Sequence, residues 1–187
     1  MILFYRPSKD RFPGGYFLVP HFAVAVTAVI RSSCPVPTYR PNVALLLLDR
    51  DDQLLICERF KIEGAWQFPQ GGMDQGETPL EALHREVEEE VGLPPSSYEV
   101  LEWRAGYRYL FPPRLRKGKK DWFDGQQQTY FLCRLKDGAP PINVDQQPRE
   151  FGSHTWVEPR LFDLRWLPPF KRQVHRQVLR DFFGVEV

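Results

Sequence analysis

The sequence predicts an α+β fold in which a mixed β-sheet lies between helices, as in an α/β/α sandwich. Runs of apolar and aromatic residues of strand length occur both before and after one strongly marked helix, and a second amphipathic helix ends the chain. Strands and helices in this order are typical of a sheet covered by helices. Apolar residues make up 42% of the 187 residues and charged residues 26%, which indicates one ordinary globular domain.

The first predicted strand is the continuous aliphatic run from Val43 to Leu48. A run of this length without polar residues is typical of a buried strand. Four polar residues at 49–52 turn the chain, and residues 54–60 are predicted to form the second strand of a hairpin. Prolines 35, 37 and 41 mark a linker, so we expect residues 1–38 to form an N-terminal extension and residues 39–187 to form the domain.

The clearest element is a helix from Pro79 to Val91. Thr78 is a suitable N-cap, and Glu81 completes a capping box with it. Proline is favoured at the first helical position, and Gly92 suits the left-handed residue that ends a helix. Four apolar side chains fall on one stripe at about 100° per residue and are expected to pack on the core: Leu80, Leu83, Val87 and Val91.

Strands are predicted again after this helix, at residues 98–111, 126–136 and 153–157, which are rich in aromatic and aliphatic side chains. Residues 169–183 predict a terminal helix, because apolar side chains recur at every fourth position: Phe170, Val174, Val178 and Phe182.

The segment 114–120 carries five basic residues among seven and is predicted to be a mobile loop. Together with Trp122 and Phe123 it could hold single-stranded RNA through phosphate attraction and base stacking. A solvated loop is the alternative interpretation.

Composition excludes several classes of protein. The chain has 25 Lys+Arg and 24 Asp+Glu, a formal charge of +1, which excludes a generally basic nucleic-acid coat. Three cysteines without CxxC spacing indicate neither a disulfide framework nor a zinc cluster and favour a reducing, cytoplasmic setting. The apolar run 16–30 is short for a membrane span and is interrupted by Pro20 and His21, so we expect no membrane association and interpret it as an added strand or extension.

Three glutamates gather on the predicted helix beside its apolar stripe. Glu86 and Glu90 are one turn apart and Glu89 lies about 60° to 100° from them, whereas Glu81 and Glu88 point elsewhere. Like charges at this spacing repel, so the cluster calls for a counter-charge. Hard oxygen ligands without His or Cys select Mg²⁺, Mn²⁺ or Ca²⁺ over zinc. A solvated acidic face is the alternative.

The residues around these glutamates resemble the Nudix box, G-x5-E-x7-R-E-U-x-E-E-x-G-U, where U is a bulky aliphatic residue. Every specified position matches: Gly71, Glu77, Arg85, Glu86, Val87, Glu89, Glu90, Gly92 and Leu93. The resemblance implies metal-dependent hydrolysis of a nucleoside diphosphate linked to another moiety, with Mg²⁺ or Mn²⁺ as the cofactor. It implies Glu86, Glu89 and Glu90 as metal ligands. The turn at Gly71 and Gly72 would let the backbone approach metal and phosphate, and Glu77 and Arg85 would form a structural pair.

Outside the box, the chain from about Tyr39 to Phe183 is similar to the branch of RNA pyrophosphohydrolases and dinucleoside polyphosphate hydrolases. The points of similarity are Tyr39–Val43, Trp66–Gly72, Gly125–Phe131, Pro148–Phe151, Trp156–Val157 and Phe170–Arg172. The similarity implies that Glu150 is a further carboxylate facing the metals and that the substrate is an RNA 5′ end or a dinucleoside polyphosphate. It implies substrate contacts from Arg40, Arg59, Gly71, Gly72, Gln126, Phe170 and Lys171.

The implied reaction is in-line attack of water on phosphorus, with Glu89 or Glu150 taking the proton. It would release pyrophosphate from 5′-triphosphorylated RNA or split a dinucleoside polyphosphate. Two alternatives are a Nudix enzyme for another nucleotide, such as ADP-ribose or a nucleoside triphosphate, and a non-catalytic nucleotide-binding regulator.

Single residues also have simpler interpretations: core packing for Phe170, a surface loop position for Glu150, and a solvated charge for Arg59 or Lys171. The branch usually has Lys or Ala, Lys and Trp at the positions of Gln127, Thr129 and Tyr130, so the substrate is less well defined than the reaction. The sequence does not predict the oligomeric state.

Overall fold

The computed structural model describes residues 36–116 and 123–187, which belong to one compact unit, Val36–Val187. The expectations for the N-terminal run 16–30, and for the part of the basic segment at 117–120, fall outside the described residues. Within those residues, no helix has the length and apolar character that crossing a membrane requires.

The unit contains seven strands, three α-helices and three short 3-10 helices. The strands are β1 (Tyr39–Leu48), β2 (Leu54–Arg59), β3 (Trp66–Gln67), β4 (Gln70–Gly72), β5 (Tyr98–Leu110), β6 (Gly125–Leu135) and β7 (Phe151–Val157). The α-helices are α1 (Pro79–Val91), α2 (Pro113–Arg116) and α3 (Pro169–Phe183), and the 3-10 helices are η1 (Pro95–Ser97), η2 (Pro159–Leu161) and η3 (Leu164–Trp166).

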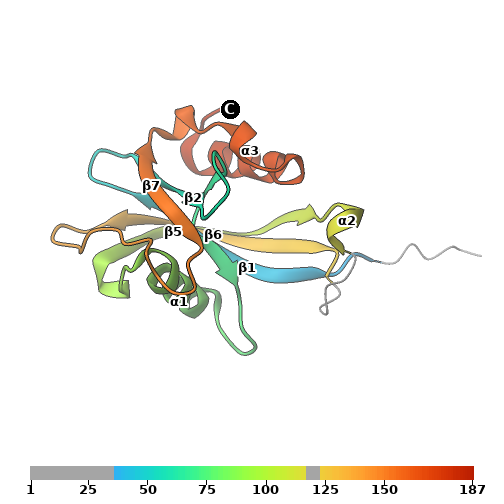
Figure 1. Ribbon diagram of the computed structural model, residues 1–187, viewed down its shortest axis with the longest axis horizontal. Helices are drawn as coiled ribbons and strands as arrows, with labels where there is room; N and C mark the ends of the chain where they lie inside the picture. Colours follow the sequence, from blue (N-terminus) through green and yellow to red (C-terminus); the bar gives the residue numbers. More distant parts are fainter. Residues whose placement is uncertain (1–35, 117–122) are drawn as a thin grey trace, which may run out of the picture. The chain divides into compact units, whose positions relative to one another are not determined.

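The strands form one mixed sheet with the order β3-β2-β1-β6-β5, to which β4 is added beside β1 and β7 beside β2. Only β1 and β6 run parallel, in register from Tyr39 with Gly125 to Leu48 with Arg134, and the other pairs are antiparallel. Helix α1 lies on one face of the sheet and α3 on the other (Figure 1). The predicted mixed sheet between helices is therefore confirmed.

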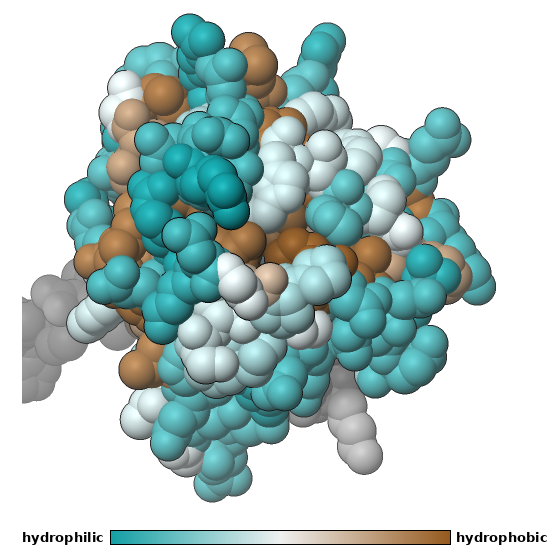
Figure 2. Space-filling view, turned by 90° about the vertical axis from the view of Figure 1, so that its left-hand side faces the viewer, coloured by the Kyte–Doolittle hydropathy of each residue, from teal (hydrophilic) through white to brown (hydrophobic). Residues whose placement is uncertain are grey.

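The buried strand β1 explains why its sequence is continuously apolar. Val43, Leu45 and Leu47 pack in the core cluster beneath α1, and the alternate residues Leu46 and Leu48 pack in the cluster beneath α3. A strand covered on both faces has no solvent side on which polar residues would be favoured. The surface drawn in Figure 2 is, by contrast, covered mainly by hydrophilic side chains, with smaller hydrophobic areas between them.

Helix α1 begins and ends where the sequence predicts. The Thr78 hydroxyl accepts the backbone N–H of Glu81, the Glu81 carboxylate accepts the backbone N–H of Thr78, and Gly92 ends the helix at φ 71°. The predicted apolar stripe is wrong at Leu80, which is 43% exposed. Its helical turn lies at the outer strand β5, where Leu80 lines an apolar hollow of about 440 Å³ with Val100 and Trp103 instead of entering the core.

Two other local predictions need correction. The hairpin after Leu48 forms, but β1 pairs with β2 only at Leu48 and Leu54, and its long partner is β6. The start of the predicted loop 114–120 is helical: it belongs to α2, Pro113–Arg116, where the Leu115 N–H donates to the Pro112 carbonyl.

His175 is a fully buried side chain of α3, stacked against Phe68 and Phe162. Its Nδ1–H donates to the Lys171 carbonyl at 3.1 Å. Burial, reinforced by the positive charge of Lys171, lowers the pKa of His175 to about 3. Between pH 6.5 and about pH 3, the imidazole therefore stays neutral in the folded protein but binds a proton in the unfolded chain.

Acid should consequently destabilise the protein through His175. Its contribution to stability is complete above pH 6.5 and is lost as the pH falls toward 3, because only the unfolded chain binds the proton in this window. Between pH 7 and pH 5 the loss should be about 2 kcal/mol of unfolding free energy. Urea unfolding at both pH values measures it. The His175→Phe variant should lack this part of the pH dependence, and an equal slope in both proteins would contradict the assignment.

Candidate active site

Gly71 and Gly72 do not form the predicted turn but lie in strand β4, which pairs with the start of β1. A Cβ atom on Gly71 would overlap the carboxylate of Glu86, and one on Gly72 would overlap the guanidinium of Arg40. Glycine is required here by close approach, not by a positive φ. Strand β4 thus has two predicted site residues, Arg40 and Glu86, against its backbone.

Arg85 is the centre of an ion-pair network that joins β4, the following loop and α1. Its Nε and Nη2 donate to both carboxylate oxygens of Glu77, at 2.7 and 2.9 Å, and its Nη2 also donates to the Gly72 carbonyl at 2.8 Å. Nη1 donates to Glu86 at 2.7 Å and to Glu89 at 3.2 Å. Hydrogen bonds from Arg85 lower the pKa of Glu77 to about 2, so this carboxylate stays ionised. The expected pairing of Glu77 with Arg85 is present.

Glu90 lies beside strand β4 and is 5% exposed. Its Oε2 accepts the backbone N–H of Gln70 at 2.9 Å, and Oε1 is buried with no hydrogen-bond partner among the described residues. Burial, followed by the negative charges of Glu150 and Glu86, raises the pKa of Glu90 well above its usual value. A buried carboxylate oxygen without a donor, next to like charges, is stabilised by a proton or by a cation beside it.

Glu150 comes from the segment before β7 and is exposed. Its backbone carbonyl accepts the Phe60 N–H at 2.8 Å, which fixes this segment beside the end of β2. Its carboxylate is near enough to Glu90 to raise the pKa of that residue. The structure therefore brings Glu150 close to two carboxylates of the box, Glu90 and Glu86.

The donor set fits a divalent cation, because every candidate ligand offers carboxylate oxygen and the unpartnered Oε1 of Glu90 lies among them. Within residues 36–116 and 123–187, however, no three acidic, histidine or cysteine side chains already converge on one ion-sized point. Arg85 draws Glu86 and Glu89 toward itself. The assignment of Glu86, Glu89, Glu90 and Glu150 as metal ligands stays a prediction.

The remaining predicted substrate residues lie on two neighbouring surfaces. Arg40 and Gln126 are paired across β1 and β6, and Gln126 accepts the hydroxyl of Tyr109 from β5. Arg59, Phe170 and Lys171 line a cavity of about 410 Å³, which we call the basic cavity. Its other lining residues are Ile62, Ala65, Trp66, Gln67, Arg114, Leu115, Arg165, Trp166, Leu167 and Pro168.

The basic cavity is coupled electrostatically to the carboxylates. Burial and the neighbouring charge of Arg59 lower the pKa of Lys171 to about 8, and the negative charge of Glu90 opposes that shift. Lys171 is therefore close enough to interact with the charge of Arg59 in the cavity and with that of Glu90 in the box. Phe170 packs against Tyr109 and Phe111 and also lines the cavity, so core packing and a site position are both satisfied by one ring.

Sequence reasoning missed several residues of this region. Trp66 and Trp166, with ring centroids 6.4 Å apart, both line the basic cavity but come from β3 and from the 3-10 helix η3. Gln128 is buried and donates to both Asn42 and Gln70, which links strands β6, β1 and β4. Trp66 and Gln128 lie in segments that resemble the branch, but the resemblance assigned no role to them. Trp166 lies outside those segments and joins the cavity only through the tertiary structure.

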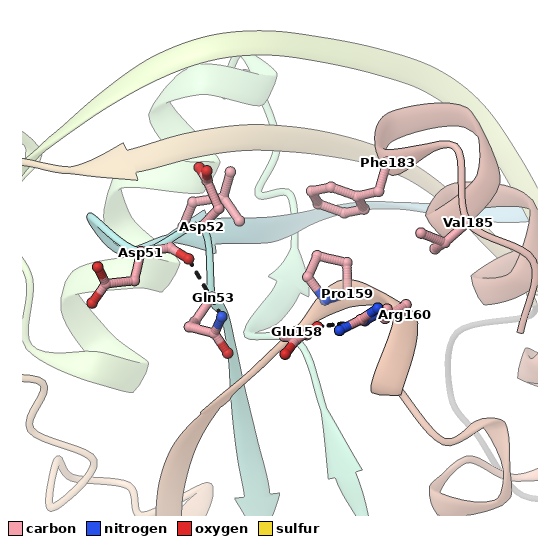
Figure 3. A pocket seen from close by; sticks show the side chains of 9 residues that line it. Asp51, Asp52, Gln53, Glu158, Pro159, Arg160, Phe183 and Val185 are labelled. Atoms are coloured by element: carbon pink, nitrogen blue, oxygen red, sulfur yellow. Dashed lines mark hydrogen bonds and ion pairs between the residues drawn. The ribbon is translucent and has the colours of Figure 1, made fainter.

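A separate hollow of about 420 Å³ is lined by residues of the β1–β2 turn, by η2 and by Phe183 and Val185 (Figure 3). No predicted site residue lines it. Glu158 at its rim is paired with Arg160 (Figure 3), so the hollow shows no excess of unpaired basic groups of the kind found in the basic cavity.

The fold and the box together define the class of protein. Residues 38–182 match the model of the NUDIX domain, and the chain belongs to the Nudix family of hydrolases. Enzymes of this family generally use divalent metal ions.

Particular relatives narrow the comparison. An RNA pyrophosphohydrolase of Helicobacter pylori (strain G27) is 47% identical over 150 residues, which cover 77% of this chain and 93% of the relative. An RNA pyrophosphohydrolase of Halorhodospira halophila (strain DSM 244 / SL1) is 41% identical over 153 residues, covering 78% of this chain and 81% of the relative. The predicted resemblance to this branch is confirmed.

Among solved structures, the E. coli dihydroneopterin triphosphate pyrophosphohydrolase aligns with a TM-score of 0.55 over 77% of this chain and 99% of its own. A C. elegans Ap4A hydrolase in a binary complex aligns with a TM-score of 0.51 over 78% of this chain and 98% of its own. Their sequence identities are 17% and 16%, so these likenesses show the shared fold alone.

Proposed function

We propose that this protein is an RNA pyrophosphohydrolase, which removes pyrophosphate from a 5′-triphosphorylated RNA and leaves a 5′-monophosphate. The observation that carries the proposal is the basic cavity, where aromatic rings and cationic side chains lie together within electrostatic reach of the box carboxylates. Rings stack on bases and cations bind phosphates, so such a cavity suits a nucleotide. The relatives named RNA pyrophosphohydrolase support the same substrate.

Mg²⁺ or Mn²⁺ is the proposed cofactor, held by Glu86, Glu89, Glu90 and Glu150. When bound, such ions neutralise phosphate charge and lower the pKa of a coordinated water. Arg40, beside the Gly72 backbone, and Lys171 would hold the phosphate chain in line for attack. Gln126 and Tyr109 lie beside Arg40 and would complete the polar wall of the site.

The proton of the attacking water has two candidate acceptors. Glu89, with a side chain 58% exposed, and Glu150, also exposed, can pass a proton to solvent after accepting it. Glu90 is enclosed and already accepts the Gln70 N–H, which suits a ligand better than a base. We therefore assign proton transfer to a carboxylate oxygen of Glu89 or Glu150.

The limits of the domain and its location are part of the same proposal. Residues 39–187 would form the hydrolase domain, supported by the family match to residues 38–182. A cytoplasmic location is supported by Cys57 and Cys133, which are buried free thiols.

The test is an activity panel with purified protein and Mg²⁺ or Mn²⁺. Triphosphorylated RNA should yield pyrophosphate and a monophosphorylated end, resolved by chromatography. Diadenosine tetraphosphate tests cleavage of a dinucleoside polyphosphate, for which mononucleotide products are expected, and ADP-ribose is the control. Turnover of ADP-ribose without turnover of RNA would overturn the proposal, and metal-dependent release of pyrophosphate would exclude a silent regulator.

A further inference from the structure

Helix α2 adds a basic residue to the substrate cavity from a distant part of the chain. Arg114 and Leu115 line the basic cavity together with Arg59, Phe170 and Lys171. Figure 1 shows α2 at the tips of β5 and β6, away from α1. Arg59 and Lys171 are the cavity's basic groups on the catalytic side, since Lys171 is coupled to Glu90 and Arg59 precedes Phe60, which bonds to the Glu150 carbonyl.

The charges of the cavity are not balanced by its own side chains. Four of its lining residues are basic, and no Asp or Glu lines it. Arg165 is neutralised by Asp163, with Nη2 at 2.7 Å from the carboxylate. For Arg59, Arg114 and Lys171, no carboxylate of the described residues lies within ion-pair distance. Three cations without a carboxylate partner in the described part of the chain, placed around aromatic rings, favour a ligand with several separated negative charges.

We propose that Arg114 is a specificity-determining residue that binds a phosphodiester of the RNA chain downstream of the nucleotide in the cavity. This inference rests on the proposed function. Arg59 and Lys171 would serve the phosphates near the scissile bond, whereas Arg114 meets the strand where it leaves the cavity. A free nucleoside triphosphate has no phosphodiester at that point, so Arg114 favours RNA over it and over dinucleoside polyphosphates.

The test compares Arg114→Gln with Arg50→Gln on a triphosphorylated RNA hexamer, diadenosine tetraphosphate and a nucleoside triphosphate. Arg50 is an exposed arginine of the remote β1–β2 turn, paired only at the surface with Asp137, and serves as the matched control. Arg114→Gln should lower kcat/KM for the hexamer about 5- to 10-fold, mainly through KM, and leave the other two substrates unchanged. The slope of log kcat/KM against log salt should fall by about 0.7 to 1.

Anisotropy of a 3′-labelled hexamer gives a second readout that needs no turnover. Arg114→Gln should weaken binding by the same factor, and Arg50→Gln should not. An equal loss on all three substrates, or unchanged RNA binding, would overturn the inference. If the wild-type protein binds the hexamer through Arg114 but releases no pyrophosphate, the proposed function fails and the binding role stands.

Discussion

Replacing Glu90 by Gln should lower kcat/KM for triphosphorylated RNA by about 10³-fold, equivalent to about 4 kcal/mol of transition-state stabilisation. The substitution keeps the shape of the side chain but removes the negative charge beside strand β4, where a cation would be held. The folded protein should not be weakened, because burial and two neighbouring carboxylates already oppose the charge of Glu90. Steady-state kinetics and urea unfolding measure the two effects separately.

Glu88→Gln is the control, since Glu88 lies on the same helix but on its exposed side. It should retain activity within about twofold, as exposed side chains away from a site usually do. Similar losses in Glu88→Gln and Glu90→Gln would show that activity follows the total charge of the helix and not the position of the buried carboxylate.

Replacing Gly71 by Ala should lower activity by about 10²-fold while leaving the fold in place. The added methyl would overlap the Glu86 carboxylate, so this side chain must turn away from the box. The Glu86 carboxylate is the far end of a flexible side chain, so its displacement should cost little stability. The displacement would, however, leave the metal site without one predicted ligand. The measurement is kcat/KM together with the midpoint of thermal unfolding.

Gly152→Ala provides the matched control for this substitution. A Cβ at Gly152 would meet only Phe60, at 3.8 Å, which is an ordinary van der Waals contact. Its activity should remain close to that of the wild type. If Gly71→Ala were as active as Gly152→Ala, the close approach between Gly71 and Glu86 would have no part in catalysis.

The sequence predicts those parts of the fold that depend on local chemistry. Thr78, Pro79 and Gly92 carry their own capping signals, and α1 spans the expected residues. The apolar run of β1 similarly predicts that this strand is buried. It does not predict that β6 is its long partner. Pairing between strands so far apart is decided by packing of the whole sheet, which no local window contains.

The site divides in the same way. Glu86, Glu89 and Glu90 can be proposed as metal ligands from the sequence, because one helix carries them at a recognisable spacing. The position of Leu80 could not be predicted from the same spacing, since a helix wheel gives direction but not where the covering sheet ends. Trp166 and Arg114 join the basic cavity only through tertiary structure, from segments that have no shared pattern.

The contacts of Arg85 have a consequence for how this region moves. One guanidinium is bonded at once to the carbonyl of Gly72, to Glu77 and to Glu86. Strand, loop and helix therefore cannot separate without breaking several of these bonds together. Local opening should involve all three segments in a single step. The backbone amides of β4, of the loop and of the start of α1 should exchange with solvent as one cooperative group.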